Sequence, residues 1–196
     1  TNGGNSWSVQ YVSPFQMRSV HFINSQTGWV TADQGSIYAT TDGGANWFSQ
    51  TSQSTYNIYS VHFINALTGW IAGGESMLNA PVIRVTTNGG TNWTAQSSPV
   101  NRRLNGVQFV NSTTGWIAGD FGTILVTVNG GVNWVQQSSG TSNYLSGLNF
   151  LNAQTGWISG GGPGTILFTS NGGSNWSQQG NNAINILSSL SFINAL

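Results

Sequence analysis

The chain has 196 residues, of which only 4% are charged, and its formal net charge at pH 7 is zero, whereas typical soluble domains contain about 25% charged residues. Four arginines without any lysine cannot build the basic surface that replaces counterions on a nucleic acid. The absence of cysteine excludes disulfides and thiolate metal sites, and no apolar run is long enough for a membrane-spanning helix.

With so few charges, the polar surface has to be built from Ser, Thr, Asn, Gln and Gly, and little charge repulsion keeps neighbouring molecules apart. Such a surface fits a protein that is secreted or packed into a larger assembly. We therefore expect a secreted, extracellular or cell-surface location. The length is sufficient for one sizeable domain with its own core.

From the N-terminus, the chain consists of one partial unit, four complete repeat units and a second partial unit. The first partial unit, 1–12, opens on TNGGNSW and contains WSVQYV (7–12), which is predicted to be a lone outer strand. The last partial unit, 181–196, ends in LSFINAL, which is predicted to be a lone first strand. The complete units cover approximately residues 13–52, 53–98, 99–139 and 140–180.

Fixed distances along the chain define the complete unit. A Phe precedes the Trp of a Thr-Gly-Trp sequence by seven residues in every unit, as Phe63 and Trp70 do. An Ile lies ten residues before the Trp of a later motif, and the next Phe follows that Trp by 16 residues. Only the segment between the Thr-Gly-Trp and the Ile varies, from 8 to 13 residues. The period of about 40–46 residues therefore contains one elastic segment.

The second unit illustrates the predicted elements. IYSVHFIN (58–65) alternates apolar and polar residues, and the sequence NALTG then turns the chain into the short strand GWIAG. A glycine-rich loop leads to VIRVTT, and the later motif turns the chain into WTAQSS. No apolar period of 3.6 residues persists, so helices are not expected. Four strands per repeat predict an all-β fold, a single β-propeller domain with four complete four-stranded blades plus strands of a fifth.

The motif between the third and fourth strands recurs five times, as in TTDGGANW (40–47). Its Asp or Asn can accept backbone N–H groups two or so residues on, and its paired glycines allow positive φ. Because four of the five copies have Asn in place of Asp, and catalysis would not tolerate the loss of a carboxylate, we interpret the motif as a structural turn. Its key residues are Asn2, Gly4, Trp7, Asp42, Gly44, Trp47, Asn88, Gly90, Trp93, Asn129, Gly131, Trp134, Asn171, Gly173 and Trp176.

The pattern [ST]-x-[DN]-x-G-x-x-W resembles the Asp-box, or bacterial neuraminidase repeat, of sialidase-type propeller blades. Combined with the FINxxTGWxxGxxGxIxxTTNGG sequence, it is similar to the photosystem II stability/assembly factor-like repeat family of secreted bacterial proteins. The resemblance covers nearly the whole chain and implies a propeller of Asp-box blades. It implies little about activity, because propellers host unrelated functions.

The chain departs from both relatives in its charged residues. Sialidases need an arginine triad and a Tyr/Glu pair, whereas here Arg84 lies in a predicted third strand and Glu75 is the single glutamate. The near-neutral chain also lacks the basic surface of photosystem assembly factors, so their photosynthetic role is not carried over. We expect no enzymatic activity, no cofactor and no metal site. His21 and His62 precede the anchor Phe of their units and are interpreted as strand residues.

Alternating strand direction places the motif turns and the Asn-x-x-Thr-Gly turns on one face of the propeller. The loops between second and third strands, and the connections between blades, lie on the other face, which we call the variable face. Functional loops usually occupy such a position on a rigid scaffold, although loops also collect charges by default. The candidate binding residues of the variable face are Asp33, Tyr56, Glu75, Arg102, Arg103, Asp120, Phe121 and Tyr144.

Together these features predict a non-enzymatic structural or interaction module whose partners are other proteins or further copies of the chain. The alternative is a carbohydrate-binding, lectin-like propeller that uses the variable face to bind a glycan. Neither nucleic-acid binding nor membrane insertion is expected. Because the two partial units leave a fifth blade incomplete, we expect either that the natural chain continues in both directions or that a neighbouring molecule fills the gap.

Overall fold

The computed structural model describes residues 5–162, 164–180 and 185–193. Within these residues, sixteen strands form four antiparallel sheets, each with four strands in sequence order, and one short 3-10 helix, η1 (Asp33–Gly35), follows the second strand. The first two sheets contain β1 (Met17–Phe22), β2 (Gly28–Ala32), β3 (Ser36–Thr40) and β4 (Phe48–Thr51), then β5 (Ile58–Phe63), β6 (Gly69–Glu75), β7 (Ala80–Thr86) and β8 (Thr94–Ala95). The last two contain β9 (Leu104–Phe109), β10 (Gly115–Gly119), β11 (Ile124–Thr127) and β12 (Val135–Gln137), then β13 (Leu145–Phe150), β14 (Gly156–Gly160), β15 (Thr165–Thr169) and β16 (Ser177–Gln178).

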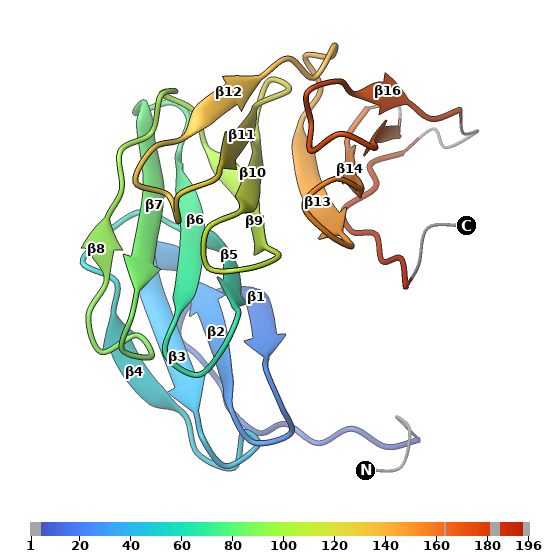
Figure 1. The fold of residues 1–196 in the computed structure, drawn as a ribbon. Helices are drawn as coiled ribbons and strands as arrows, with labels where there is room; N and C mark the ends of the chain where they lie inside the picture. Colours follow the sequence, from blue (N-terminus) through green and yellow to red (C-terminus); the bar gives the residue numbers. More distant parts are fainter. Residues whose placement is uncertain (1–4, 163, 181–184, 194–196) are drawn as a thin grey trace.

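The four sheets are the four predicted blades, and they follow one another around an arc (Figure 1). The first strands β1, β5, β9 and β13 are neighbours on the inside of the arc. The all-β propeller with four complete four-stranded blades is therefore confirmed. No helix in the described part of the chain is long and apolar enough to cross a membrane.

The Gly of each Thr-Gly-Trp sequence is explained by the Phe that precedes it. Phe109 at the end of β9 pairs with Gly115 at the start of β10, and the Phe ring lies over the glycine. A Cβ on Gly115 would approach the ring to 2.5 Å, and the equivalent glycines of the other blades are covered in the same way. The constant Phe-to-Trp spacing therefore keeps a pair of residues in register across the first two strands.

The apolar core lies between neighbouring blades, and aromatic stacking connects them. Trp70 of the second blade stacks on Phe109 of the third, with ring centroids 3.5 Å apart and planes 8° apart. The rings of Phe109 and Trp134, in the same blade, are nearly perpendicular, with centroids 5.8 Å apart. The indole N–H of Trp70 donates to the carbonyl of Gly130, in the motif turn of the third blade, at 3.2 Å. The Thr-Gly-Trp of each of the first three blades therefore fixes its own blade to the next one.

The motif turns satisfy their own polar groups, as the structural interpretation predicts. In the copy of the second blade, Thr86 Oγ1 accepts the N–H of Gly90 at 2.9 Å and donates to Asn88 Oδ1 at 3.0 Å. Asn88 Oδ1 also accepts the N–H of Asn92 at 2.9 Å, four residues on instead of the predicted two. Both glycines have positive φ, 70° at Gly89 and 90° at Gly90, a region in which a side chain is strained.

In the first three blades, a glutamine three residues after the motif Trp adds a second connection to the next blade. Gln96 Nε2 donates to the carbonyl of Gly130 in the next blade at 2.8 Å, and Gln96 Oε1 accepts the indole N–H of Trp134 at 3.2 Å. Gln50 and Gln137 reach the carbonyls of Gly89 and Gly172 in the same manner. A short outer strand is therefore held in place by its side chain as well as by its backbone ladder.

The two partial units differ from the prediction, because their described residues, 5–12 and 185–193, form no regular strand. They still make contacts of the blade type: Gln10 Nε2 reaches the Gly43 carbonyl at 3.4 Å, and Phe192 stacks on Trp157 at 4.2 Å. Trp7 is 90% exposed, whereas Trp93 and Trp134 of the complete motifs are buried and Trp47 and Trp176 are half-buried. Without the two middle strands of a blade, neither segment has a ladder to join. Asn2 and Gly4 lie outside the described residues.

Candidate functional site

Hydrogen bonds between turns confirm the predicted division into two faces. The N–H of Gly89 in the second motif turn donates to the carbonyl of Leu67 in the Asn-x-x-Thr-Gly turn of the same blade at 2.8 Å. Both turns therefore lie on one face. On the other face, loops between second and third strands contact blade connections, as the N–H of Gln34 does by donating to Asn57 Oδ1 at 3.0 Å.

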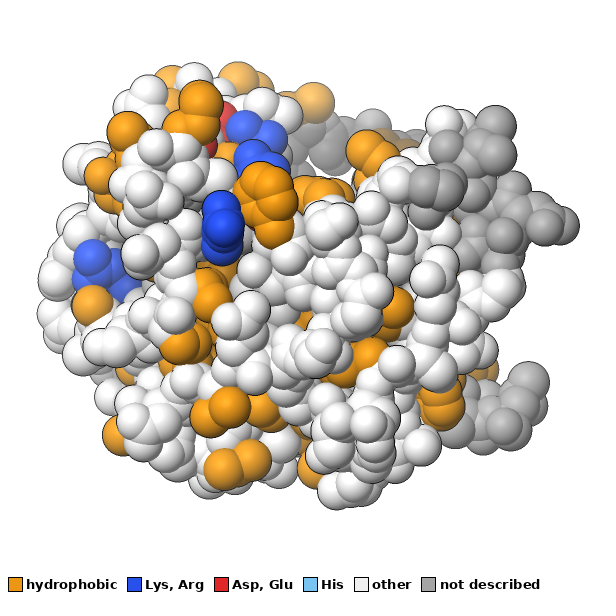
Figure 2. Space-filling view, turned by 90° about the horizontal axis from the view of Figure 1, so that it is seen from above, with side chains coloured by type: hydrophobic (Ala, Val, Ile, Leu, Met, Phe, Trp, Pro, Cys, Tyr) orange, Lys and Arg blue, Asp and Glu red, His pale blue; other side chains and the backbone are white. Residues whose placement is uncertain are grey.

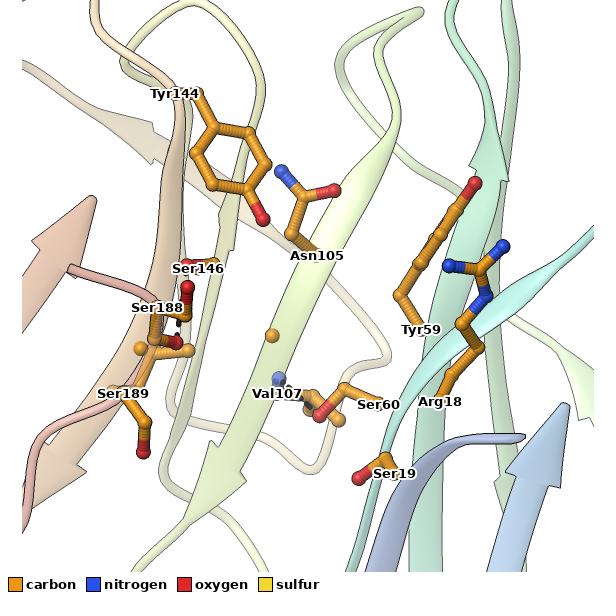
Figure 3. Close-up of a pocket in the computed structure, with 13 residues that line it drawn as sticks. Arg18, Ser19, Tyr59, Ser60, Asn105, Val107, Tyr144, Ser146, Ser188 and Ser189 are labelled. Carbon is orange, nitrogen blue, oxygen red and sulfur yellow. Dashed lines mark hydrogen bonds between the residues drawn. The ribbon is translucent and has the colours of Figure 1, made fainter. Parts of the chain in front are cut away.

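The first strands of the four blades enclose an open cavity of about 430 Å³, the central channel of the arc (Figure 3). Its waist is lined by small residues of the first strands. Ser19 Oγ accepts the N–H of Val61 at 3.4 Å, and Ser60 Oγ accepts the N–H of Val107 at 3.1 Å, so these hydroxyls bridge neighbouring strands. The lining is consequently polar but almost uncharged.

An ion pair lies beside the channel at the first blade. Arg18 on β1 binds Asp33 of η1 through two hydrogen bonds, Nε to Oδ1 at 2.6 Å and Nη2 to Oδ2 at 2.9 Å. The hydrogen bonding of Arg18 to the Asp33 carboxylate raises the pKa of Arg18 above its ordinary value. The guanidinium carbon also lies 5.3 Å from the ring centre of Tyr59 on β5. This geometry fixes the direction of the arginine across the channel mouth.

A second and more buried network holds Asp120, the residue after β10. Its Oδ1 accepts from Arg103 Nη2 at 3.1 Å and from Asn105 Nδ2 at 3.0 Å, and its Oδ2 accepts from Ser76 Oγ at 2.6 Å. Burial lowers the pKa of Arg103, but the Asp120 carboxylate and Tyr59 together outweigh this effect and the pKa is raised. Ser76 also accepts the N–H of Arg103 at 3.1 Å, so three segments meet at one carboxylate. With these partners Asp120 acts as an anchor for Arg103.

Two tyrosines complete the site. The Arg103 guanidinium lies 5.2 Å from the ring centre of Tyr59 and 6.0 Å from that of Tyr144, distances compatible with cation–π attraction. In Figure 3, Tyr144 and Asn105 face Tyr59 and Arg18 across the cavity. We call the group Arg18, Tyr59, Arg103, Asn105 and Tyr144 the channel rim. Figure 2 shows that the few charged groups visible from that side stand beside hydrophobic side chains, on a surface that is otherwise mostly uncharged.

The structure brings four of the eight predicted binding residues to the channel: Arg103 and Tyr144 in the rim, and Asp33 and Asp120 as the carboxylates that hold its arginines. The other four, Arg102, Phe121, Tyr56 and Glu75, lie outside the channel. The guanidinium carbon of Arg102 lies 4.6 Å from the ring centre of Phe121, beside a separate depression of about 470 Å³.

Tyr56 and Glu75 do not reach the channel cavity. Tyr56 packs against the core between the first and second blades. Glu75 ends β6, where its Oε1 accepts the N–H of Met77 at 3.5 Å.

Sequence reasoning missed Arg18 and Tyr59, because they lie in predicted strands, and Asn105, which stands near the end of the predicted connection 97–106. All three occupy the same position, four residues before the anchor Phe of their unit. The fourth unit has Ser146 there, and Ser146 also lines the cavity. The signal was the strong chemical variation at one position of an otherwise regular repeat.

The arrangement is suited to binding through hydrogen bonds and stacking. No group of three or more His, Cys, Asp or Glu residues that could hold a metal ion occurs in the part of the chain that the structure describes. His21 and His62 are strand residues whose rings bridge blades: His21 Nε2 is 2.9 Å from the carbonyl of Phe63, and His62 Nδ1 accepts the N–H of Phe109 at 3.4 Å.

Comparison with known proteins places these features in a family. Residues 4–106 and 85–183 match the family model described as photosynthesis system II assembly factor YCF48. A search of curated proteins found no match. A structure of YCF48 bound to D1 peptide is similar, with 18% identity, 87% of this chain and 82% of that chain covered, and a TM-score of 0.57.

Two further structures support the fold. YCF48 from Cyanidioschyzon merolae has 20% identity and a TM-score of 0.69, with 93% of this chain and 62% of that chain covered. The GH74 enzyme of Niastella koreensis has 19% identity and a TM-score of 0.64, with 79% of this chain but only 28% of that chain covered. The chain thus spans less than two thirds of both. Because the family model covers nearly all of the four blades, the chain belongs to the family of the photosynthesis system II assembly factor YCF48.

Proposed function

We propose that the chain is a non-enzymatic interaction module and that a protein partner binds at the channel rim. One observation carries the proposal: the rim gathers two arginines and two tyrosines from four blades around an open cavity. Family membership supports it, because a YCF48 structure has been solved with a peptide bound. The photosynthetic partner of that protein is not part of the proposal.

The chemistry of the rim suits an extended peptide. An arginine has five N–H donors, and the described hydrogen bonds of Arg18 to Asp33 use two of them. The remaining donors can bind the carbonyl or carboxylate oxygens of a peptide. Tyr59 and Tyr144 offer rigid rings that lose little side-chain entropy on binding. Because Asp33 and Asp120 hold the arginines in place beforehand, the ordering cost of binding is reduced.

The test is selection of peptides against the whole chain from a random display library, followed by titration of a selected synthetic peptide. We expect Tyr59→Ala and Tyr144→Ala each to weaken binding at least tenfold. Leu67→Ala is the matched control, because Leu67 is exposed on the opposite face, and it should leave the affinity unchanged. Peptides whose affinity is insensitive to both tyrosine variants would overturn the rim as the binding site.

A second candidate function is carbohydrate binding at the same cavity. Its lining is nearly neutral and contributes hydroxyl and amide groups beside aromatic rings, which is the chemistry that a sugar requires. A glycan array should then reveal saturable binding that Tyr144→Ala abolishes. Tyr56→Ala is a control in this test, because Tyr56 packs against the core. Absence of any saturable glycan would leave the peptide as the ligand.

The proposal also includes a secreted or surface location, assembly with other proteins or further copies, and the absence of catalysis. The carboxylates beside the channel are each bound to an arginine, which supports a holding role over an acid or base role. Assays with sialyl and xyloglucan substrates should show no turnover. Hydrolysis that depends on Asp33 or Asp120 would contradict this part of the proposal.

A further inference from the structure

The three internal interfaces between blades share one construction. The Trp of each Thr-Gly-Trp stacks on the anchor Phe of the next blade, with ring centroids 3.5 to 3.6 Å apart and planes 5 to 8° apart. The same indole N–H donates to the carbonyl of the first motif glycine of that blade at 3.1 to 3.2 Å. An Asp-box blade therefore presents a receptor for an indole, made of a Phe face and a glycine carbonyl.

The first blade presents this receptor on its exposed side. Phe22 is 40% exposed, whereas the equivalent Phe63 and Phe109 are 2% exposed. Val20 is 62% exposed, whereas the equivalent Val61 is 4% exposed. Met17, at the start of β1, extends the same apolar surface and is 41% exposed.

The receptor is already in its binding geometry. The Phe22 ring lies over Gly28 as the other anchor rings lie over their glycines, and its edge meets Trp47 at 5.9 Å and 88°. The Gly43 carbonyl corresponds to the three indole acceptors. It is reached by Gln10 Nε2 at 3.4 Å, a weaker contact than the 2.8 to 3.1 Å of the equivalent glutamines in the other blades.

We propose that the surface formed by Met17, Val20 and Phe22 is a docking site for a β-hairpin that carries Thr-Gly-Trp, the middle two strands of a further Asp-box blade. The hairpin stacks its indole on Phe22 and donates the indole N–H to the Gly43 carbonyl. The occupant is identified by the three internal interfaces, in which a Thr-Gly-Trp hairpin covers the same receptor. This surface is separate from the channel rim, so the inference does not depend on the proposed function.

The test uses the whole chain and a labelled synthetic peptide with the sequence of residues 113–128, which form the middle hairpin of the third blade. Fluorescence anisotropy should show saturable binding, and the bound peptide should raise the melting temperature of the chain. The same peptide with Trp116→Ala should bind at least tenfold more weakly. A peptide that fails to bind the whole chain would overturn the proposal.

Variants of the chain locate the site. Val20→Glu places a charge on the surface at an exposed position where folding is not at risk, and it should weaken peptide binding at least tenfold. Phe22→Ala should do the same, with circular dichroism as the check on folding. Phe121→Ala, which is exposed on the variable face, is the matched control and should leave binding unchanged.

One further result would count against the proposal, and another would identify its occupant. Binding that withstands both Val20→Glu and Phe22→Ala would place the peptide elsewhere. Self-association of the chain that is abolished both by Trp157→Ala and by Val20→Glu would support the proposal, and it would identify the Thr-Gly-Trp hairpin in the last blade of a second copy as the occupant.

Discussion

At the scale of single residues, the threonine that opens each motif turn is the centre of its hydrogen bonding. Thr127 is buried, and its Oγ1 accepts from the N–H of Gly131 at 2.9 Å while it donates to Asn129 Oδ1 at 2.9 Å. In the copy at residues 40–47, hydrogen bonds from the side chain and backbone of Asn46 lower the pKa of Asp42, so the carboxylate serves the turn as an acceptor. This equivalence of Asp and Asn explains why the motif tolerates either.

Replacement of Thr127 tests this role. Thr127→Val keeps the shape of the side chain but leaves the buried N–H of Gly131 without its acceptor, which costs about 1–3 kcal/mol. Thr127→Ser is the control and should retain most of the stability. Urea denaturation of both variants measures the difference, and a Val variant as stable as the Ser variant would contradict the assignment.

His62 makes stability depend on pH. Burial, followed by the charge of His21, lowers the pKa of His62 from 6.5 to about 3. The unfolded chain therefore takes up a proton between these values that the folded chain does not, so stability is complete above about pH 6.5 and declines as the pH falls toward 3. We expect the free energy of unfolding to be lower at pH 5 than at pH 7 by about 2 kcal/mol.

The chain supplies the control for this prediction. The third blade has Gln108 at the position of His62, and its amide bonds the backbone of Phe150 in both directions, at 2.8 and 3.1 Å. His62→Gln should therefore preserve the bridge between blades and reduce the pH dependence. Urea denaturation at pH 5 and pH 7 measures the pH dependence of stability. If His62→Gln leaves that dependence unchanged, another titratable group causes it.

At the scale of the elements, each anchor Phe that joins two blades is closely packed on three sides. Phe109 is stacked on by Trp70, meets Trp134 at its edge, and covers Gly115. Side chains in such close packing resist added volume. The constant spacing along the chain is the consequence of this three-sided contact.

Gly115→Ala should destabilise the protein by about 1–3 kcal/mol, because the new Cβ meets the trapped Phe109 ring at 2.5 Å. Gly180→Ala is the matched control: no atom lies within 4 Å of its added Cβ. Thermal denaturation compares the two. Equal melting temperatures would show that the Phe109 ring can move aside to accommodate the added Cβ.

At the scale of the whole molecule, regular parts were predictable and the site was only partly so. The repeat spacing gave the blades because Phe, Gly and Trp contact one another in every unit. The position of Arg103 in a predicted loop indicated the variable face, but it did not indicate that the side chain lies beside the central channel. The neighbouring Arg102 turns instead to Phe121 at a separate depression. Tyr59 was missed because its role arises only when the strands of several blades are brought around one channel.

The low charge of the molecule predicts a stability that salt hardly changes. The described residues form two ion pairs, Arg18 with Asp33 and Arg103 with Asp120, and both are partly exposed. Such pairs contribute little and are screened by salt. Raising NaCl from about 0.05 M to about 0.5 M should therefore lower the melting temperature by less than about 4 °C. A larger fall would indicate a stronger contribution, which Asp33→Asn and Asp120→Asn would assign to one of the pairs.

The Phe, Gly and Trp joints between blades have a consequence for the gene. Since one set of positions in each unit meets one set in the following unit, any unit is an acceptable neighbour for any other. Unequal recombination between the repeats would then lengthen or shorten the arc without inventing a new kind of contact. Selection could meanwhile vary the residue four places before each Phe, and so alter what the channel binds while the joints stay the same.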